Sequence, residues 1–126
     1  MGYESRIYVV DKHDFGTYDD GKNYAEILAM FDMCKCYPLS NVLRDKPKTD
    51  CYIYADDHNT RIVEDRYGEE LTEATVKEVI DILESEVAKG EDYRRIFPLL
   101  SALKSIEELQ NDGKFGDNVV VLHYGY

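Results

Sequence analysis

Apolar residues recur with two different periods along this chain of 126 residues. Residues 49–55 alternate, with Cys51 and Ile53 facing one way and two tyrosines facing the other, which is the period of a half-buried strand. Residues 76–87 instead place an apolar side chain every three or four positions, which is the period of an amphipathic helix. A chain with both patterns is expected to pack one-sided helices against a sheet.

The same two patterns cover most of the chain. Four segments have the strand pattern: residues 4–10, 49–55, 60–67 and 118–126. The two middle strands are expected to form a hairpin around the polar turn at 56–59. Three segments have the helix pattern: from Asn23 up to Pro38, from the cap Thr72 to Gly90, and residues 93–110.

The expected order of elements is therefore β-α-β-β-α-α-β. This order predicts an α+β domain of two layers, in which three helices cover one face of a four-stranded mixed or antiparallel sheet. The length fits a single domain, and no linker, repeat or low-complexity segment divides residues 1–126.

The chain is strongly acidic, with 26 acidic and 15 basic residues and a formal net charge of −11. Direct binding to nucleic acid is disfavoured because phosphate contacts need a positive surface, and anionic membranes repel the chain for the same reason. Residues 64–92 hold 11 acidic and 3 basic residues, so most of the charge is concentrated there. Such a run either keeps the surface solvated or docks on a basic partner.

Three carboxylates recur at every third position of the second expected helix. Glu78, Asp81 and Glu84 would repeat about every 4.5 Å along its axis, close to the ~3.4 Å spacing of phosphates along one DNA strand. This row could compete for a groove built for phosphates, and we predict it as a partner-binding surface.

Tyrosine is abundant, with 11 residues against 4 phenylalanines and no tryptophan. Tyr8, Tyr52 and Tyr54 are expected on one face of the sheet. That face is either covered by another layer or left exposed as a platform, in which case Tyr52 and Tyr54 would anchor a partner.

The cysteines and histidines do not form a metal-binding pattern. A zinc site would need Cys34, Cys36, Cys51 and His58 together. Two cysteines two positions apart on a helix point about 200° away from each other, and no C-x-x-C motif occurs. We therefore predict no metal and no cofactor, with Cys51 in the core, and leave a cation in the Asp11–Asn23 loop open.

No strong catalytic motif occurs, so we predict no catalytic residues and no enzyme. A small enzyme or metal protein that uses His13, His58 and neighbouring aspartates is the alternative. His123 is expected to be an ordinary strand residue. The start of the chain has no signal-peptide pattern, and no segment has the length and apolarity of a membrane span. The odd number of cysteines suggests reduced thiols. A cytoplasmic location is therefore expected.

The whole chain resembles small acidic proteins of unknown function encoded by phages and prophages. The segments that carry the resemblance are YESRIYVVDK, YAEILAMFDMCK, TDCYIYADD, RIVEDRYG and DYRRIFPLLSAL. The resemblance brings no functional residues. It implies binding of a host protein, including inhibition of nucleic-acid-cutting defence systems, in the cytoplasm of the host cell.

The first hypothesis for function is a non-enzymatic acidic module that occludes a basic, nucleic-acid-binding host protein. It predicts an association that weakens steeply with salt. Besides the small enzyme or metal protein, a third hypothesis is a homo-oligomeric structural phage protein, such as a homodimer, with the tyrosine face as its contact.

Overall fold

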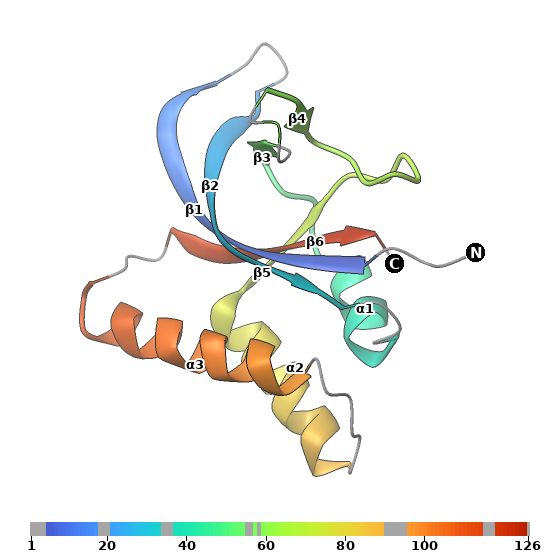
Figure 1. Cartoon of the computed structure of the whole chain (residues 1–126), viewed down its shortest axis with the longest axis vertical. Coiled ribbons are helices and arrows are strands. Elements are labelled where there is room, and N and C mark those ends of the chain that lie inside the picture. Colours follow the sequence, from blue (N-terminus) through green and yellow to red (C-terminus); the bar gives the residue numbers. More distant parts are fainter. Residues whose placement is uncertain are drawn as a thin grey trace.

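The computed structural model describes residues 5–17, 21–33, 37–54, 57, 59–89, 96–114 and 118–125. These residues form six strands and three helices (Figure 1). The strands are β1 (Ser5–Thr17), β2 (Asn23–Asp32), β3 (Cys51–Tyr54), β4 (Arg61–Ile62), β5 (Thr72–Thr75) and β6 (Val119–Gly125). The helices are α1 (Tyr37–Arg44), α2 (Val76–Ala88) and α3 (Ile96–Asn111). The α+β class is confirmed, but the prediction of four strands in the order β-α-β-β-α-α-β is wrong.

The six strands form one mixed sheet in the order β4-β3-β2-β1-β6-β5. The pair β2–β3 is parallel, with α1 in the connection between them, and the other neighbouring strands are antiparallel. β1 pairs with β2 on one side and with β6 on the other, so it lies in the middle of the sheet.

Both faces of β1 are buried, and each belongs to a separate core cluster. Ile7 and Val9 pack with residues of α2 and α3 such as Leu83 and Leu99. Tyr8 and Val10 belong to a second cluster, which includes side chains of β3 and β6. Figure 1 shows α2 and α3 on one side of the sheet, with β1 and β2 bending strongly toward β3 and β4. The sheet thus curls to cover the face that the helices leave.

The largest difference from expectation is that residues 23–32 form β2 instead of a helix. Val9 pairs with Ala29 and Val10 pairs with Ile27, so Leu28 is an extra residue at a β-bulge. The bulge interrupts the alternation of the strand and leaves apolar residues at spacings that imitate a helical stripe. Hydrogen bonding to β1 decides the structure, and the sequence pattern does not show that pairing.

The helices differ from expectation mainly at their beginnings. Pro38 was expected to end a helix but lies in the first turn of α1, where a missing backbone N–H costs nothing. Thr72 was expected to cap α2 but lies in β5, and the cap is Thr75. The Thr75 side chain accepts a hydrogen bond from the backbone N–H of Glu78. The carboxylate of Glu78 in turn accepts a hydrogen bond from the backbone N–H of Thr75, which completes a capping box.

The expected hairpin is confirmed in its pairing. Tyr54 of β3 lies opposite Arg61 of β4, although β4 is only two residues long and was expected to cover residues 60–67. The carboxylate of Asp57 accepts hydrogen bonds from the backbone N–H groups of Asn59 and Thr60, which fixes the turn.

The capping box gives a test of where α2 begins. Replacing Thr75 by alanine removes the acceptor for the Glu78 amide and should lower the free energy of unfolding by about 1 kcal/mol. Replacing it by serine keeps that acceptor and should change stability much less. Urea denaturation of both variants and the wild type measures this, and equal losses for alanine and serine would contradict the assignment.

Candidate functional site

The three carboxylates predicted to bind a partner each lie next to a lysine. Glu78 forms an ion pair with Lys46, which also lowers the pKa of its carboxyl group, and it belongs to the capping box of α2. Asp81 lies 3.7 Å from Lys77, and Glu84 lies 2.9 Å from Lys104. The row is therefore locally balanced by cations, two of which come from outside α2. Its role in binding stays a prediction.

The tyrosines form a cluster where β2 and β3 meet, instead of an exposed platform. The rings of Tyr24, Tyr52 and Tyr54 lie 5.5 to 5.8 Å apart, and the guanidinium of Arg61 lies 5.2 Å from the ring centre of Tyr52. Tyr52 and Tyr8 are each only 5% exposed, but of these two only Tyr8 packs in the core cluster of the curled face, together with Cys51 and Ile53 of β3. Tyr54 is half-buried. Of the two alternatives for these tyrosines, burial therefore holds for Tyr8 and Tyr52. The expectation that both lie on one face is wrong, because Tyr52 alternates along β3 with Cys51 and Ile53, which pack with Tyr8.

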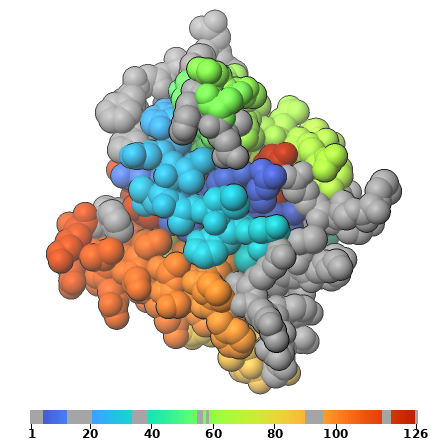
Figure 2. Space-filling view, in the orientation of Figure 1, coloured from blue at the N-terminus to red at the C-terminus, as the bar shows by residue number. Residues whose placement is uncertain are grey.

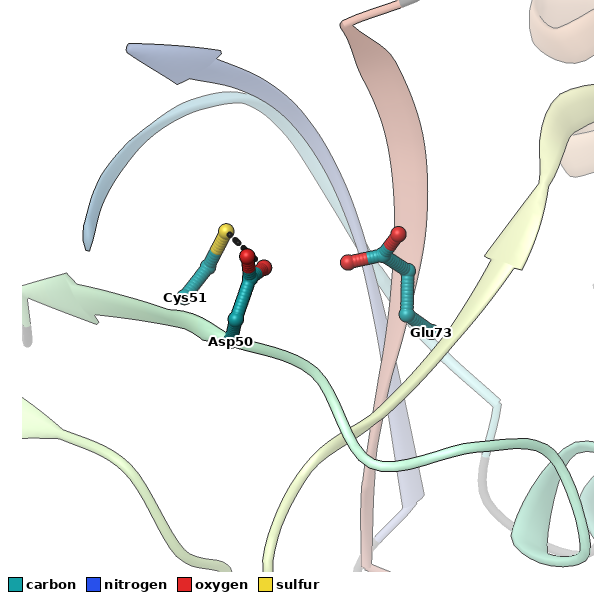
Figure 3. A group of neighbouring side chains, drawn as sticks. All are labelled: Asp50, Cys51 and Glu73. Carbon is teal, nitrogen blue, oxygen red and sulfur yellow. Dashed lines mark hydrogen bonds between the residues drawn. The ribbon is translucent and has the colours of Figure 1, made fainter. Parts of the chain in front are cut away.

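Asp50, Cys51 and Glu73 form the group of side chains in the described structure that most resembles a metal site (Figure 3). Their ligand atoms lie within 4.8 Å of one another, with Asp50 and Cys51 at the start of β3 and Glu73 on β5. The Cys51 thiol donates a hydrogen bond to the Asp50 carboxylate over 3.4 Å. Burial raises the pKa of that thiol to about 11, so it keeps its proton at neutral pH.

One ammonium group lies between the two carboxylates of this cluster. Nζ of Lys12 lies 3.1 Å from Oδ1 of Asp50 and 3.3 Å from Oε1 of Glu73. The hydrogen bond from Lys12 also lowers the pKa of Asp50. The lysine therefore lies where it offsets part of the charge of both carboxylates, and the cluster ties β1, β3 and β5 together. Of the zinc ligands considered from the sequence, Cys34, Cys36 and His58 lie outside the described residues.

The side chain of His13 and most of the acidic loop before Asn23 also lie outside the described residues. The hypothesis of an enzyme built on His13 and His58 therefore stays an untested alternative. The same holds for a cation bound in that loop.

His123 on β6 takes part in a buried polar chain that the sequence did not predict. Its Nε2 lies 3.2 Å from Oγ of Ser5, which lies 3.0 Å from Oγ of Ser40 on α1. All three residues are buried. Burial lowers the pKa of His123 to about 4, because desolvation outweighs the attraction of the nearby Asp65 charge, so the ring is neutral at pH 7. These three side chains come from segments that are far apart in the sequence, so no local pattern predicts their hydrogen bonds.

The ring of His123 also lines a cavity of about 360 Å³. The cavity lies between the end of α1, the segment before β5 and the end of β6. Its wall combines side chains of both charges with the imidazole, and its volume falls in the ~300–1,000 Å³ range of small-molecule sites.

A second surface of interest follows the outer side of β2. β3 pairs with β2 only at Asn23 and Tyr24, and no other strand of the described structure continues the sheet beyond that point on this side. Ile27, Leu28 and Met30 are exposed there, Met30 by 50%. Figure 2 shows the light-blue and cyan atoms of this region at the surface in the middle of one face of the molecule.

Comparison of this chain with protein-family models, with curated proteins and with solved structures found no match. In the part of the chain that the structure describes, none of the helices has the length and apolarity needed to cross a membrane.

The environment of Cys51 predicts an unreactive thiol. In a C34S/C36S variant, Cys51 is the only cysteine of the chain. Because it is buried and its pKa is raised to about 11, it should react with iodoacetamide at least a hundredfold more slowly in the folded chain than in urea. Mass spectrometry of the alkylated protein measures the rate. Fast reaction of the folded chain would show that the thiol is accessible.

The neutral His123 predicts a loss of stability in mild acid. The unfolded chain takes up a proton near pH 6.5 and the folded chain near pH 4, so acidification through this window favours unfolding. Between about pH 7 and about pH 5 this residue should cost about 2 kcal/mol, measured by urea denaturation. A His123→Gln variant lacks this titration, so its free energy of unfolding should fall by about 2 kcal/mol less than that of the wild type over the same pH interval. A proton NMR titration that places the pKa of His123 near 6.5 would contradict the prediction.

Proposed function

We propose that this chain is a non-enzymatic acidic protein-binding module and that it binds a basic protein through the outer side of β2. The proposal rests on the exposed apolar side chains of β2. Beyond Tyr24, no strand of the described structure pairs with the outer side of β2. Exposed apolar surface on a strand at a sheet edge is a common protein-binding surface.

The bulge at Leu28 shapes this surface. A bulge twists a strand and breaks its regular hydrogen bonding, which protects an edge from indiscriminate pairing with other strands. Leu28 and Met30 are nevertheless 40% and 50% exposed, so apolar contacts remain available. A partner would therefore combine side-chain contacts around Leu28 with strand pairing along Ala29–Asp32.

The charge of β2 favours a basic partner. Its ten residues include Glu26 and Asp32 and no lysine or arginine, in a chain of net charge −11. A positively charged segment with apolar side chains would complement both properties. The long-range attraction that speeds association would come from the net charge of the chain rather than from the lysine-paired row on α2.

A second copy of this chain fits the same surface poorly. If two copies of β2 paired antiparallel about Ala29, Glu26 of one copy would lie opposite Asp32 of the other. Like charges directly opposite on neighbouring strands are destabilising, and each copy also carries a net charge of −11. A homodimer through β2 is therefore the less favourable arrangement.

Occlusion of a nucleic-acid-binding protein is the proposed consequence of binding. Proteins that bind nucleic acid carry the basic surface that this module would attract. The resemblance to phage and prophage proteins would make the partner a host protein, with inhibition of a nucleic-acid-cutting defence system as the activity.

The proposal predicts how affinity capture from a bacterial lysate responds to salt and to substitution. The captured protein should be basic. It should be retained at about 0.1 M salt and lost at about 1 M salt, because the Debye length falls from ~10 to ~3 Å between these concentrations. A Leu28→Ser/Met30→Ser variant should bind at least about tenfold more weakly, because two apolar side chains leave the interface.

Two control variants locate the interface. Phe97→Ser on α3 removes an equally exposed apolar side chain elsewhere and should leave capture unchanged. An Asp81→Asn/Glu84→Gln variant tests the row on α2 without disturbing its cap and should have a smaller effect than the change on β2. Capture that survives both β2 substitutions, or a chain that is a homodimer through this surface, would contradict the proposal.

A further inference from the structure

The cavity beside His123 carries an excess of negative charge. Four carboxylates line it, those of Asp45, Asp65, Glu69 and Glu70, against the two cations Arg44 and Lys48. Two of these carboxylates form only long ion pairs: Lys48 lies 3.9 Å from Glu69, and Lys22 lies 3.6 Å from Glu70. Partly exposed pairs at such distances neutralise little charge. The cavity therefore favours a cation over an anion.

Asp65 is held in place by the backbone of its own loop. Its Oδ1 accepts hydrogen bonds from the N–H groups of Tyr67, over 2.7 Å, and of Glu69, over 3.0 Å. The backbone of Asp65 and Glu69 is also joined by a hydrogen bond. This side of the cavity is therefore preorganised, and a ligand would not have to order it.

His123 adds an acceptor to the cavity. The ring is 4% exposed, and its Nε2 faces Ser5. His123 is also one of the residues that line the cavity. When Nε2 donates its proton to Ser5, Nδ1 of the neutral ring is left as an acceptor.

We propose that this cavity binds a guanidinium group, with the carboxylates of Asp65 and Glu70 and Nδ1 of His123 as its acceptors. A guanidinium presents five N–H donors in one plane and is weakly hydrated, so it suits a preorganised pocket with several separate acceptors. The group would come from a small molecule or from an arginine side chain of a protein. The inference does not depend on the surface of β2 and would survive the failure of the proposed function.

Nitrogen-15 NMR of the His123 ring tests the inference on the whole chain. Methylguanidinium should shift the Nδ1 resonance in a saturable way, and sodium chloride at the same ionic strength should not. Glu70→Gln should weaken this binding roughly threefold or more, since it removes one charge of the pocket. The matched control Glu84→Gln removes the same charge from α2 and should leave the affinity unchanged.

Two further probes decide the chemistry and its source. Binding of the peptide Gly-Arg-Gly as well as methylguanidinium would support a group that a partner protein can supply, and binding of methylguanidinium alone would support a small molecule. A saturable Nδ1 shift with inorganic phosphate instead, or no shift with either guanidinium probe, would overturn the inference. An equal loss of affinity in Glu70→Gln and Glu84→Gln would also overturn it, because the effect would then come from net charge alone.

Discussion

The burial of β1 on both faces is the constraint on which the rest of the structure depends. Ile7 and Val9 need an apolar cover on one side, and Tyr8 and Val10 need one on the other. A flat sheet with all helices on one face would leave the second pair in water. The helices cover Ile7 and Val9, and the curl of the sheet covers Tyr8 and Val10. Because of this curl, β3 pairs with only a short part of β2, and the outer side of β2 is left exposed.

The same packing gives several polar groups of the described structure a structural role. Lys12 lies between the carboxylates beside Cys51, lysines lie against the acidic row of α2, and Tyr8 packs in the core of the curled face. Individual surface ion pairs contribute little to stability, but each one offsets charge that a binding surface would otherwise present to a partner. In the part of the chain that the structure describes, the apolar edge of β2 and the acidic cavity at His123 are the surfaces that we propose for recognition.

The sequence predicted those parts of the fold whose pattern is local. The stripes of α2 and α3, the hairpin of β3 with β4, and the strand β6 have a regular period and recognisable turn residues. β2 was missed because the bulge at Leu28 hides its alternation. The Lys46–Glu78 pair and the Ser5–His123 contact were missed because both join remote segments, and no local signal marks such pairs.

Amide hydrogen exchange along residues 25–32 of the isolated chain tests most directly whether β2 presents an open edge. The account predicts that amides facing β1 are protected and that amides facing outward exchange orders of magnitude faster, in an alternation interrupted at Leu28. Uniform protection would show that another strand or a second copy covers the edge. Helical protection across the segment would contradict both the strand and the binding surface built on it.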